Sequence, residues 1–243
     1  MLNRWLRDVS AFSDLSADDR RSLASIGKLN RAPAGEALTA PDGNPGSYLI
    51  VSGIACFASR EQDERLITDI FVPGEFFSAP CSKAKVNSLE ALTMCTYAFF
   101  DHSALLPLVG AQPSLGRALW RVARRREGSL RETIANVGRR PARERVAYFL
   151  LDLHHRLSND NETPLSRVLP LSNVQIAGAT ALSPVHVGRV MADLEQRGLV
   201  RKEGRRLILK DPTKLMTLIR AAERGDMPLD APGQDRASVC AGL

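Results

Sequence analysis

Two predicted helix starts lie close together in the C-terminal third of the chain, and they limit the fold more than any other feature. Ser172 and Gln175 have the S-x-x-Q spacing of a capping box, in which both side chains bind backbone N–H groups of the first helical turn. Ser183 and Pro184 form a second start, a capping residue followed by proline at the first helical position. The first helix therefore has to end near Thr180. Two short helices joined by a turn of three or four residues form a helix-turn-helix.

The second of these helices, in the stretch LSPVHVGRVMADLEQRGLV, has two faces of different character. The apolar face is expected to pack on the first helix, and it consists of Val187, Val190, Met191 and Leu194. The opposite face at the helix start consists of Val185, His186 and Arg189. In a helix-turn-helix this outer face enters the major groove of DNA. Arg189 can donate two parallel hydrogen bonds to guanine, Val185 can contact a thymine methyl group, and His186 can reach a phosphate or a base edge.

A basic hairpin is predicted directly after the second helix. The stretch LVRKEGRRLILKD contains two short strand patterns around a Glu-Gly pair, with Arg205 and Arg206 at the tip. A hairpin of this kind beside a helix-turn-helix is a wing, and its arginines bind DNA phosphates. With Ser172 and Ser183 at the two helix starts, these arginines complete the expected DNA-binding surface.

Charge is distributed unevenly along the 243 residues. Residues 1–110 contain 10 lysines and arginines against 13 aspartates and glutamates, a net charge of −3, whereas residues 111–243 contain 23 against 14, a net charge of +9. An asymmetry of this kind favours contact between the C-terminal half and a polyanion. Taken alone, the charge also fits a solvated basic surface without a partner.

The region between about residues 28 and 100 has the composition of a small β domain. Runs such as SYLIVSG, ERLITDIFV and TMCTYAFF are rich in β-branched and aromatic residues, and turn clusters such as PDGNPG separate them. Many short strands at this spacing predict an all-β sandwich or barrel. Residues 14–27 are expected to form a short helix before it.

A long amphipathic helix is predicted after the β region, beginning at Pro113 and Ser114. Its apolar stripe is interrupted by Arg126 and consists of Leu115, Leu119, Val122, Leu130, Ile134 and Val137. Either of two surfaces can cover such a stripe: the same helix of a second copy of the chain, or the β domain of the same chain. We favour the first, a homodimer. Gly138 is expected to act as a hinge before a further helix that begins near Pro141.

Composition argues against several other classes of protein. Hydrophobic residues make up 44% and charged residues 25%, as in ordinary globular proteins, and no apolar run reaches the roughly 18 residues of a membrane helix. The stretch MLNRWLRDVS has no long apolar segment, so we expect no signal peptide and a cytoplasmic protein. Because no Ser-His-Asp set, paired-carboxylate motif or phosphate loop stands out, we expect no enzyme activity, no cofactor and no metal.

The four cysteines are scattered and include no C-x-x-C pair, which argues against a disulfide framework or a zinc site. Cys81 is the candidate redox residue, because Lys83 and Lys85 flank it and can lower the pKa of its thiol. Two of the other cysteines lie in strand patterns and are expected in the core, and the last has no expected role: Cys56, Cys95 and Cys240. Three histidines are expected to be surface residues: His102, His154 and His155.

The order of a β domain, a long helix and a winged helix-turn-helix resembles the catabolite-activator and fumarate-nitrate-regulator (Crp/Fnr) family of bacterial transcription factors. The matching stretches are YLIVSG, FVPGEFF, GRRPARERVAYFL, LSPVHVGRVMADLEQRGLV and EGRRLIL. The resemblance implies an α+β fold: a cyclic-nucleotide-binding-type β-roll at 1–110, a dimerisation helix at 111–138 and a winged helix-turn-helix at 139–225. It also implies a homodimer that reads a palindrome in double-stranded DNA and acts on RNA polymerase. Residues 226–243 are small, polar and rich in proline and glycine, so we expect them to form a flexible tail.

The effector pocket that the resemblance implies departs from that of the best-known members. Gly74-Glu75 match the pair that contacts ribose, but Lys85-Val86 stand where members that bind cyclic AMP have Arg-Ser. Leu130-Arg131 stand where those members have Thr-Ser. Oxygen-sensing members hold an iron–sulfur cluster on an N-terminal cysteine cluster, whereas the first 55 residues here contain no cysteine. We therefore expect neither cyclic AMP nor an iron–sulfur cluster to control the protein.

The helix-turn-helix departs from the family pattern at two positions. Val185 stands where many members have a glutamate that reads the half-site, and Ala181 replaces the turn glycine, at a cost of about 1 kcal/mol if it is left-handed. The sequence is thus interpreted as a dimeric, sequence-specific DNA-binding regulator. The alternative is a ligand- or redox-sensing β-roll with a degenerate DNA-binding domain, against which Arg189 and the basic wing argue.

Overall fold

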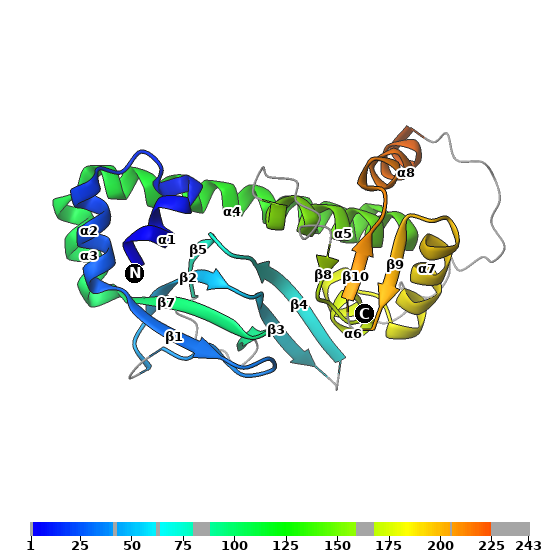
Figure 1. Ribbon diagram of the computed structural model, residues 1–243, viewed down its shortest axis with the longest axis horizontal. Helices are drawn as coiled ribbons and strands as arrows, with labels where there is room; N and C mark the ends of the chain where they lie inside the picture. Colours follow the sequence, from blue (N-terminus) through cyan, green and yellow to red (C-terminus); the bar gives the residue numbers. More distant parts are fainter. Residues whose placement is uncertain are drawn as a thin grey trace, which may run out of the picture.

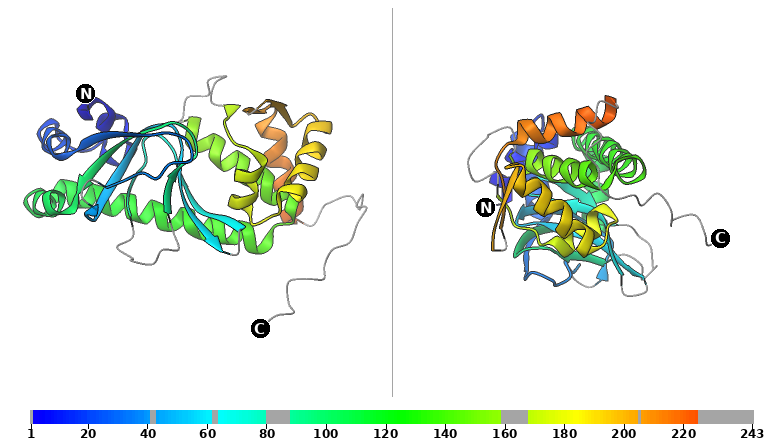
Figure 2. Two further views of the ribbon diagram at one scale, coloured as in Figure 1. Left: turned by 90° about the horizontal axis from the view of Figure 1, so that it is seen from below. Right: turned by 90° about the vertical axis from the view of Figure 1, so that its right-hand side faces the viewer.

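The computed structural model describes residues 2–40, 43–61, 64–79, 88–158, 168–204 and 206–224. A β domain and a C-terminal domain lie side by side, and the long helix α4 (Pro113–Arg139) runs along the β domain and leads into α5 (Ala142–Ser158) of the C-terminal domain (Figure 1; Figure 2, left). Some residues singled out in the sequence lie outside the described residues: Cys81, Lys85, Val86, Arg205, Cys240 and the tail from 226 onwards.

The β domain consists of two antiparallel sheets with helices on one side. The four-stranded sheet has the order β1 (Lys28–Ala32), β7 (Cys95–Asp101), β2 (Gly46–Ser52) and β5 (Phe76–Ser78). The three-stranded sheet has the order β4 (Glu64–Phe71), β3 (Ala55–Glu61) and β6 (Ser88–Ala91). The helices are α1 (Leu2–Asp8), η1 (Ser10–Phe12), α2 (Ala17–Ile26) and α3 (His102–Ala111).

Alternation of side chains along β7 shows how the layers are built. Ala98 and Phe100 face the helices, whereas Tyr97 and Phe99 face the core between the two sheets. In that core the rings of Phe71 and Phe77 stack at a centroid distance of 3.5 Å. The fold is therefore α+β, with a β domain closed by aromatic packing.

Cys56 and Cys95 lie in strands and are both 0% exposed, so the expectation that they are core residues is confirmed. Burial raises the pKa of the Cys56 thiol to about 12 and that of the Cys95 thiol to about 11. Because the thiolate is the reactive form of cysteine, both side chains are unreactive at neutral pH.

Helix α4 has two apolar faces where the sequence indicated one stripe. Leu115 is 0% exposed, and Leu119 and Val122 pack against the same cluster, which joins α1, η1 and the four-stranded sheet. The assignment of Leu115 to a dimer surface is therefore wrong, and the alternative of packing on the chain's own β domain holds for the first half of the helix. Leu130 and Ile134 are instead 39% and 72% exposed.

The junction between α4 and α5 differs from the prediction of a hinge at Gly138. Gly138 continues α4, and the helix ends at Arg139, before Arg140 and Pro141. Proline has no N–H to donate and disfavours helical geometry in the residue before it, so the break falls there. The Arg145 guanidinium donates to the Arg140 carbonyl oxygen at 3.1 and 3.2 Å, which ties the start of α5 to the break.

The C-terminal domain is a winged helix-turn-helix built around α5. Its elements are β8 (Val168–Leu169), α6 (Asn173–Thr180), α7 (Pro184–Gln196), β9 (Val200–Glu203), β10 (Arg206–Leu209) and α8 (Pro212–Arg224), and its sheet has the order β8-β10-β9. The capping box of Ser172 and Gln175 is present, and Ser183 caps α7, as predicted.

No helix among the described residues has the length and apolar composition needed to cross a membrane.

The histidines of α5 do not both lie on the surface. His154 is 1% exposed, because α5 packs against α6, α7 and α8, and its Nδ1 lies 3.3 Å from the Ser158 hydroxyl oxygen. The prediction of a surface residue is wrong for His154. His155 is exposed, and His102 is half-buried with its Nε2 at 3.1 Å from the Ser47 hydroxyl oxygen.

The turn between α6 and α7 contains a left-handed alanine. Ala181 has φ 49° and ψ 49°, and the following Leu182 N–H donates to the Ala177 carbonyl oxygen at 3.1 Å. Helices commonly end at a residue in this left-handed conformation, and that residue is usually glycine. A side chain there costs roughly 1–2 kcal/mol, so the helix-turn-helix is strained at this residue.

We predict that Ala181→Gly raises the free energy of unfolding by about 1 kcal/mol, because glycine removes the left-handed strain. Urea denaturation at one protein concentration measures the change. Ala192→Gly is the matched control, since Ala192 is exposed within α7 and right-handed, and it should lower the free energy of unfolding by about 0.5–1 kcal/mol. Equal destabilisation by both substitutions would contradict the assignment of strain to Ala181.

Candidate DNA-binding site

The start of α7 presents a small exposed face. Val185 is 67% exposed, and His186 and Arg189 are exposed beside it. The opposite side of α7 is buried in the domain core through Val187, Val190, Met191 and Leu194. The division of α7 into a packed face and an outward face agrees with its sequence pattern, and the helix lies at the end of the molecule away from the β domain (Figure 1).

Serines at the two helix starts border this face. The Ser172 hydroxyl oxygen accepts from the Gln175 N–H at 3.3 Å, and the Ser183 hydroxyl oxygen accepts from the His186 N–H at 3.2 Å. Both hydroxyl groups accept in these bonds, so their hydrogens can be donated to phosphate oxygens. Both serines are exposed, which suits contacts that position a protein on the DNA backbone.

The wing adds cations beside α7. Gly204 turns the chain between β9 and β10 with φ 58°, a left-handed conformation that suits glycine. Lys202 and Arg206 are exposed on the two strands. Arg201 forms an ion pair with Glu203 on β9. Exposed cations on a hairpin next to the outward face of α7 can bind phosphates on both sides of a groove.

Ion pairs within the domain fix the direction of α7. The Asp193 carboxylate of α7 binds the Arg143 guanidinium of α5 at 2.8 Å and the Arg197 guanidinium at 2.9 Å. The Arg145 guanidinium donates to the Thr180 carbonyl oxygen at 3.2 Å and so binds the C-terminal end of α6. Helix α5 thus holds both helices of the helix-turn-helix.

The expected effector residues are not brought together. Glu75 lies in the turn between β4 and β5, where it accepts hydrogen bonds from Arg156 of α5. Arg131 pairs with Glu127 on α4 at 2.5 Å and Leu130 is partly exposed. A cavity of about 590 Å³ lies beside Glu75, between residues 71–76, α4 and α5, and neither Leu130 nor Arg131 lines it. The placement of these two residues in an effector pocket is therefore corrected.

Arg156 was not indicated by the sequence. It is separated from Glu75 by 81 residues, and an arginine on the last turn of a helix normally lies in solvent. No local pattern could have paired the two.

Among the described residues, no group of three or more His, Cys, Asp or Glu side chains is arranged to hold a metal ion.

Comparison with known proteins finds a matching domain family and similar regulatory proteins. A family model described as the Crp-like helix-turn-helix domain matches residues 144–218. The chain is 30% identical over 174 residues to the nitrogen fixation regulation protein FixK of Azorhizobium caulinodans, with 70% of each chain covered. It is 26% identical over 221 residues to the transcriptional activator protein Anr of Pseudomonas protegens, covering 87% of this chain and 88% of that protein.

Solved structures are similar to this chain in fold. FixK2 from Bradyrhizobium japonicum has a TM-score of 0.68 at 21% identity and covers 79% of this chain and 97% of its own. A CooA mutant from Carboxydothermus hydrogenoformans has a TM-score of 0.59 at 20% identity, covering 80% and 88%. The fold and the exposed face of α7 define a DNA-binding transcriptional regulator. The chain belongs to the Crp/Fnr family.

Proposed function

We propose that this regulator works in the cytoplasm as a homodimer, in which two α7 helices read the halves of a palindromic DNA site, and that it acts on RNA polymerase. The observation that carries the proposal is the exposed face of Val185, His186 and Arg189 beside the basic wing. Relatives named as transcriptional activators support the part concerning RNA polymerase. We propose no catalytic activity for it.

The outward face of α4 is the proposed dimer surface. Trp120, Leu130 and Ile134 are 67%, 39% and 72% exposed. With Ala123 and Glu127 they follow the alternating three- and four-residue spacing of a two-stranded coiled coil. Large apolar side chains gathered on one face of a helix favour a partner that covers them. A second copy of α4 related by a two-fold axis along the helix would place both C-terminal domains at the same end.

We predict that Leu130→Asp combined with Ile134→Asp gives a monomer, because two carboxylates would be buried against their copies. Sedimentation velocity measures the change, and Ala135→Asp is the control, since it adds a carboxylate at an exposed position about 100° around the helix from Ile134. An unchanged dimer in the double variant would overturn the assignment. Leu119 and Val122 are unsuitable for this test, because they pack within the β domain.

We predict that Arg189→Ala weakens binding by about 1–3 kcal/mol per half-site and relaxes the preference at one G·C pair. Selection of bound DNA from a random pool measures both effects. Val185→Glu should sharpen the preference at another pair, since a carboxylate accepts from cytosine and is repelled by acceptor edges. If Arg189→Ala selects the same sequence as the parent, α7 does not read bases. If the parent protein itself selects no sequence, the alternative of a sensing module with a degenerate DNA-binding domain is favoured.

Arg206→Ala is the matched control for Arg189→Ala. An interaction with phosphate carries no sequence information, so its removal should weaken binding to all sequences alike. The slope of affinity against salt concentration should fall by roughly one for each phosphate that is no longer neutralised.

We further propose that neither cyclic AMP nor an iron–sulfur cluster controls this protein. Both oxygens of the Glu75 carboxylate are bound by Arg156, and Leu130 offers no hydrogen bond to adenine. We therefore predict that calorimetry shows no binding of cyclic AMP at micromolar nucleotide concentration. A submicromolar affinity would contradict this part of the proposal.

A further inference from the structure

The C-terminal domain and the β domain share one apolar core. Ile54, Ile67, Ile70 and Leu92 of the β domain belong to the same buried cluster as the side chains of α5, α6 and α7. Helix α6, the first helix of the helix-turn-helix, packs against β4. The C-terminal domain is therefore docked on the face of the three-stranded sheet (Figure 1; Figure 2, left).

Gly178 lies at a close approach between α6 and β4. A Cβ atom at this position would lie 2.8 Å from the Arg65 carbonyl oxygen and 3.3 Å from the Ile67 side chain. Glycine inside a helix costs about 1 kcal/mol relative to alanine, and here it permits the helix backbone to meet the strand backbone. Nearby, the Gln175 amide donates to the Leu92 carbonyl oxygen at 3.3 Å.

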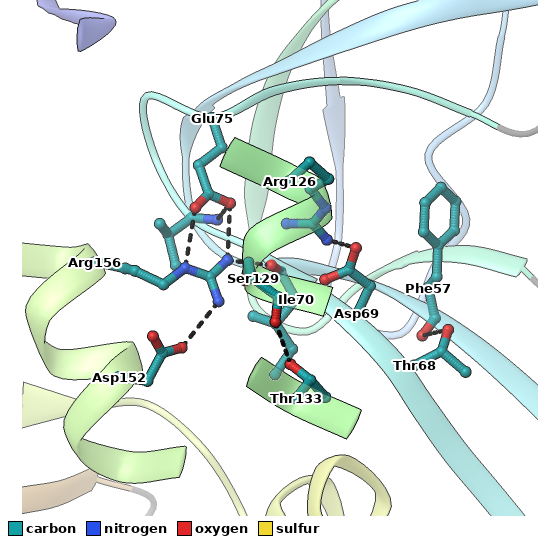
Figure 3. A network of polar contacts seen from close by, with 11 residues as sticks. Phe57, Thr68, Asp69, Ile70, Glu75, Arg126, Ser129, Thr133, Asp152 and Arg156 are labelled. Carbon is teal, nitrogen blue, oxygen red and sulfur yellow. Dashed lines mark hydrogen bonds and ion pairs between the residues drawn. The ribbon is translucent and has the colours of Figure 1, made fainter. Parts of the chain in front are cut away.

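Arg156 binds α5 to β4 and to the turn that follows it. Its Nε donates to one oxygen of Glu75 at 3.0 Å and its Nη2 to the other at 2.9 Å, a bidentate pair (Figure 3). It also donates to the Ile70 carbonyl oxygen of β4 and, at 3.3 Å, to Asp152. Burial lowers the pKa of Arg156, but Glu75 and Asp152 outweigh burial and hold it above its usual value.

Helix α4 is bound to β4 as well. Arg126 forms an ion pair with Asp69 (Figure 3). Its guanidinium also lies 4.3 Å from the centroid of the Phe71 ring. Strand β4 thus contacts the helix that carries the proposed dimer surface and the helix-turn-helix that carries the reading face. The contacts of β4 therefore connect α4 to the C-terminal domain non-covalently, in addition to the covalent junction at Arg140 and Pro141.

We propose that Arg156 and Gly178 are positioning residues for DNA recognition, which fix the C-terminal domain on the three-stranded sheet and thereby set the distance between the two α7 helices of the dimer. This inference rests on the proposed dimeric reading of a palindrome. A change of one base pair between half-sites moves one of them by about 3.4 Å and turns it by roughly 35°. A docked domain cannot follow that displacement, whereas a domain held only by the α4–α5 junction can.

The experiment measures affinity for palindromes whose spacer is shortened or lengthened by one and two base pairs from the selected optimum. Arg156→Ala and Gly178→Ala are compared with the parent. The matched controls are Arg220→Ala, an exposed arginine of α8, and Gly128→Ala, where an added Cβ atom has no neighbour within 4 Å. Sedimentation and thermal unfolding establish that each variant is a folded dimer.

The measured quantity is the ratio of the affinity for the optimal spacer to the affinity for an altered spacer. This ratio should be about tenfold smaller in both variants than in the parent, while the controls should keep the parent's ratio. The preferred bases within each half-site should not change, since Arg189 is untouched. Arg156→Lys, which keeps a charge near Glu75 but not the bidentate geometry, should lie between the parent and Arg156→Ala.

Folded variants with the parent's spacer profile would overturn the inference. If Arg156→Ala fails to fold, Gly178→Ala and Arg156→Lys decide it alone, because alanine favours helix and lysine preserves the charge. A parent protein that binds single half-sites as tightly as palindromes refutes the dimeric reading itself and this inference with it. A parent that selects one spacer, with variants that do the same, refutes the inference only.

Discussion

The packing of α6 on β4 is the contact on which the arrangement of the molecule depends. Three consecutive small residues, Ala177, Gly178 and Ala179, are buried in α6, so that the helix is covered by α7 on one side and by the sheet on another. Bulkier side chains would separate these layers. Once α6 is seated, the direction of α7 follows from the short turn at Ala181 and from the ion pair of Asp193 with Arg143. The position of the outward face is thus a result of helix-to-sheet packing as much as of the helix-turn-helix itself.

Helix α4 meets two demands with one amphipathic sequence. Its first half completes the core beside the four-stranded sheet through Leu115 and Ala118. Its second half turns polar on the inner side, where Arg126 meets Asp69 and buried Asn136 donates to the Arg145 carbonyl oxygen at 3.2 Å. The exposed apolar residues on the outer side are thereby left for another surface. A wide apolar stripe on a long helix therefore does not indicate a single partner.

The predictions from sequence succeeded where the signal is local. The capping box at Ser172 and the cap at Ser183 each involve residues within one helical turn, and hydrogen-bonding rules specify them. Periodicity separated the strands from the helices for the same reason. Periodicity could not assign Leu115 to one of two apolar partners. The hinge was assigned to Gly138 because of its residue type, whereas the helix ends just before Arg140 and Pro141.

Contacts between distant segments could not be predicted. The pairing of Arg156 with Glu75 and the approach of Gly178 to Arg65 depend on how two domains meet, and neither residue type has a spacing rule that reports this. His154 is a related case, because α5 packs against three helices that come later in the chain, α6, α7 and α8. For the site, the outward face of α7 could be recognised from sequence, whereas the residues that hold it in place could not.

The shared core has a consequence for how the protein folds and how its parts can be exchanged. A buried isoleucine or leucine loses about 1.5–3 kcal/mol of stabilisation when it is exposed, and separation of the two domains would uncover several on each side. This buried surface therefore opposes separation of the C-terminal domain from the β domain, and grafting this DNA-binding domain onto another β-roll requires the surface of β4 to be transferred with it.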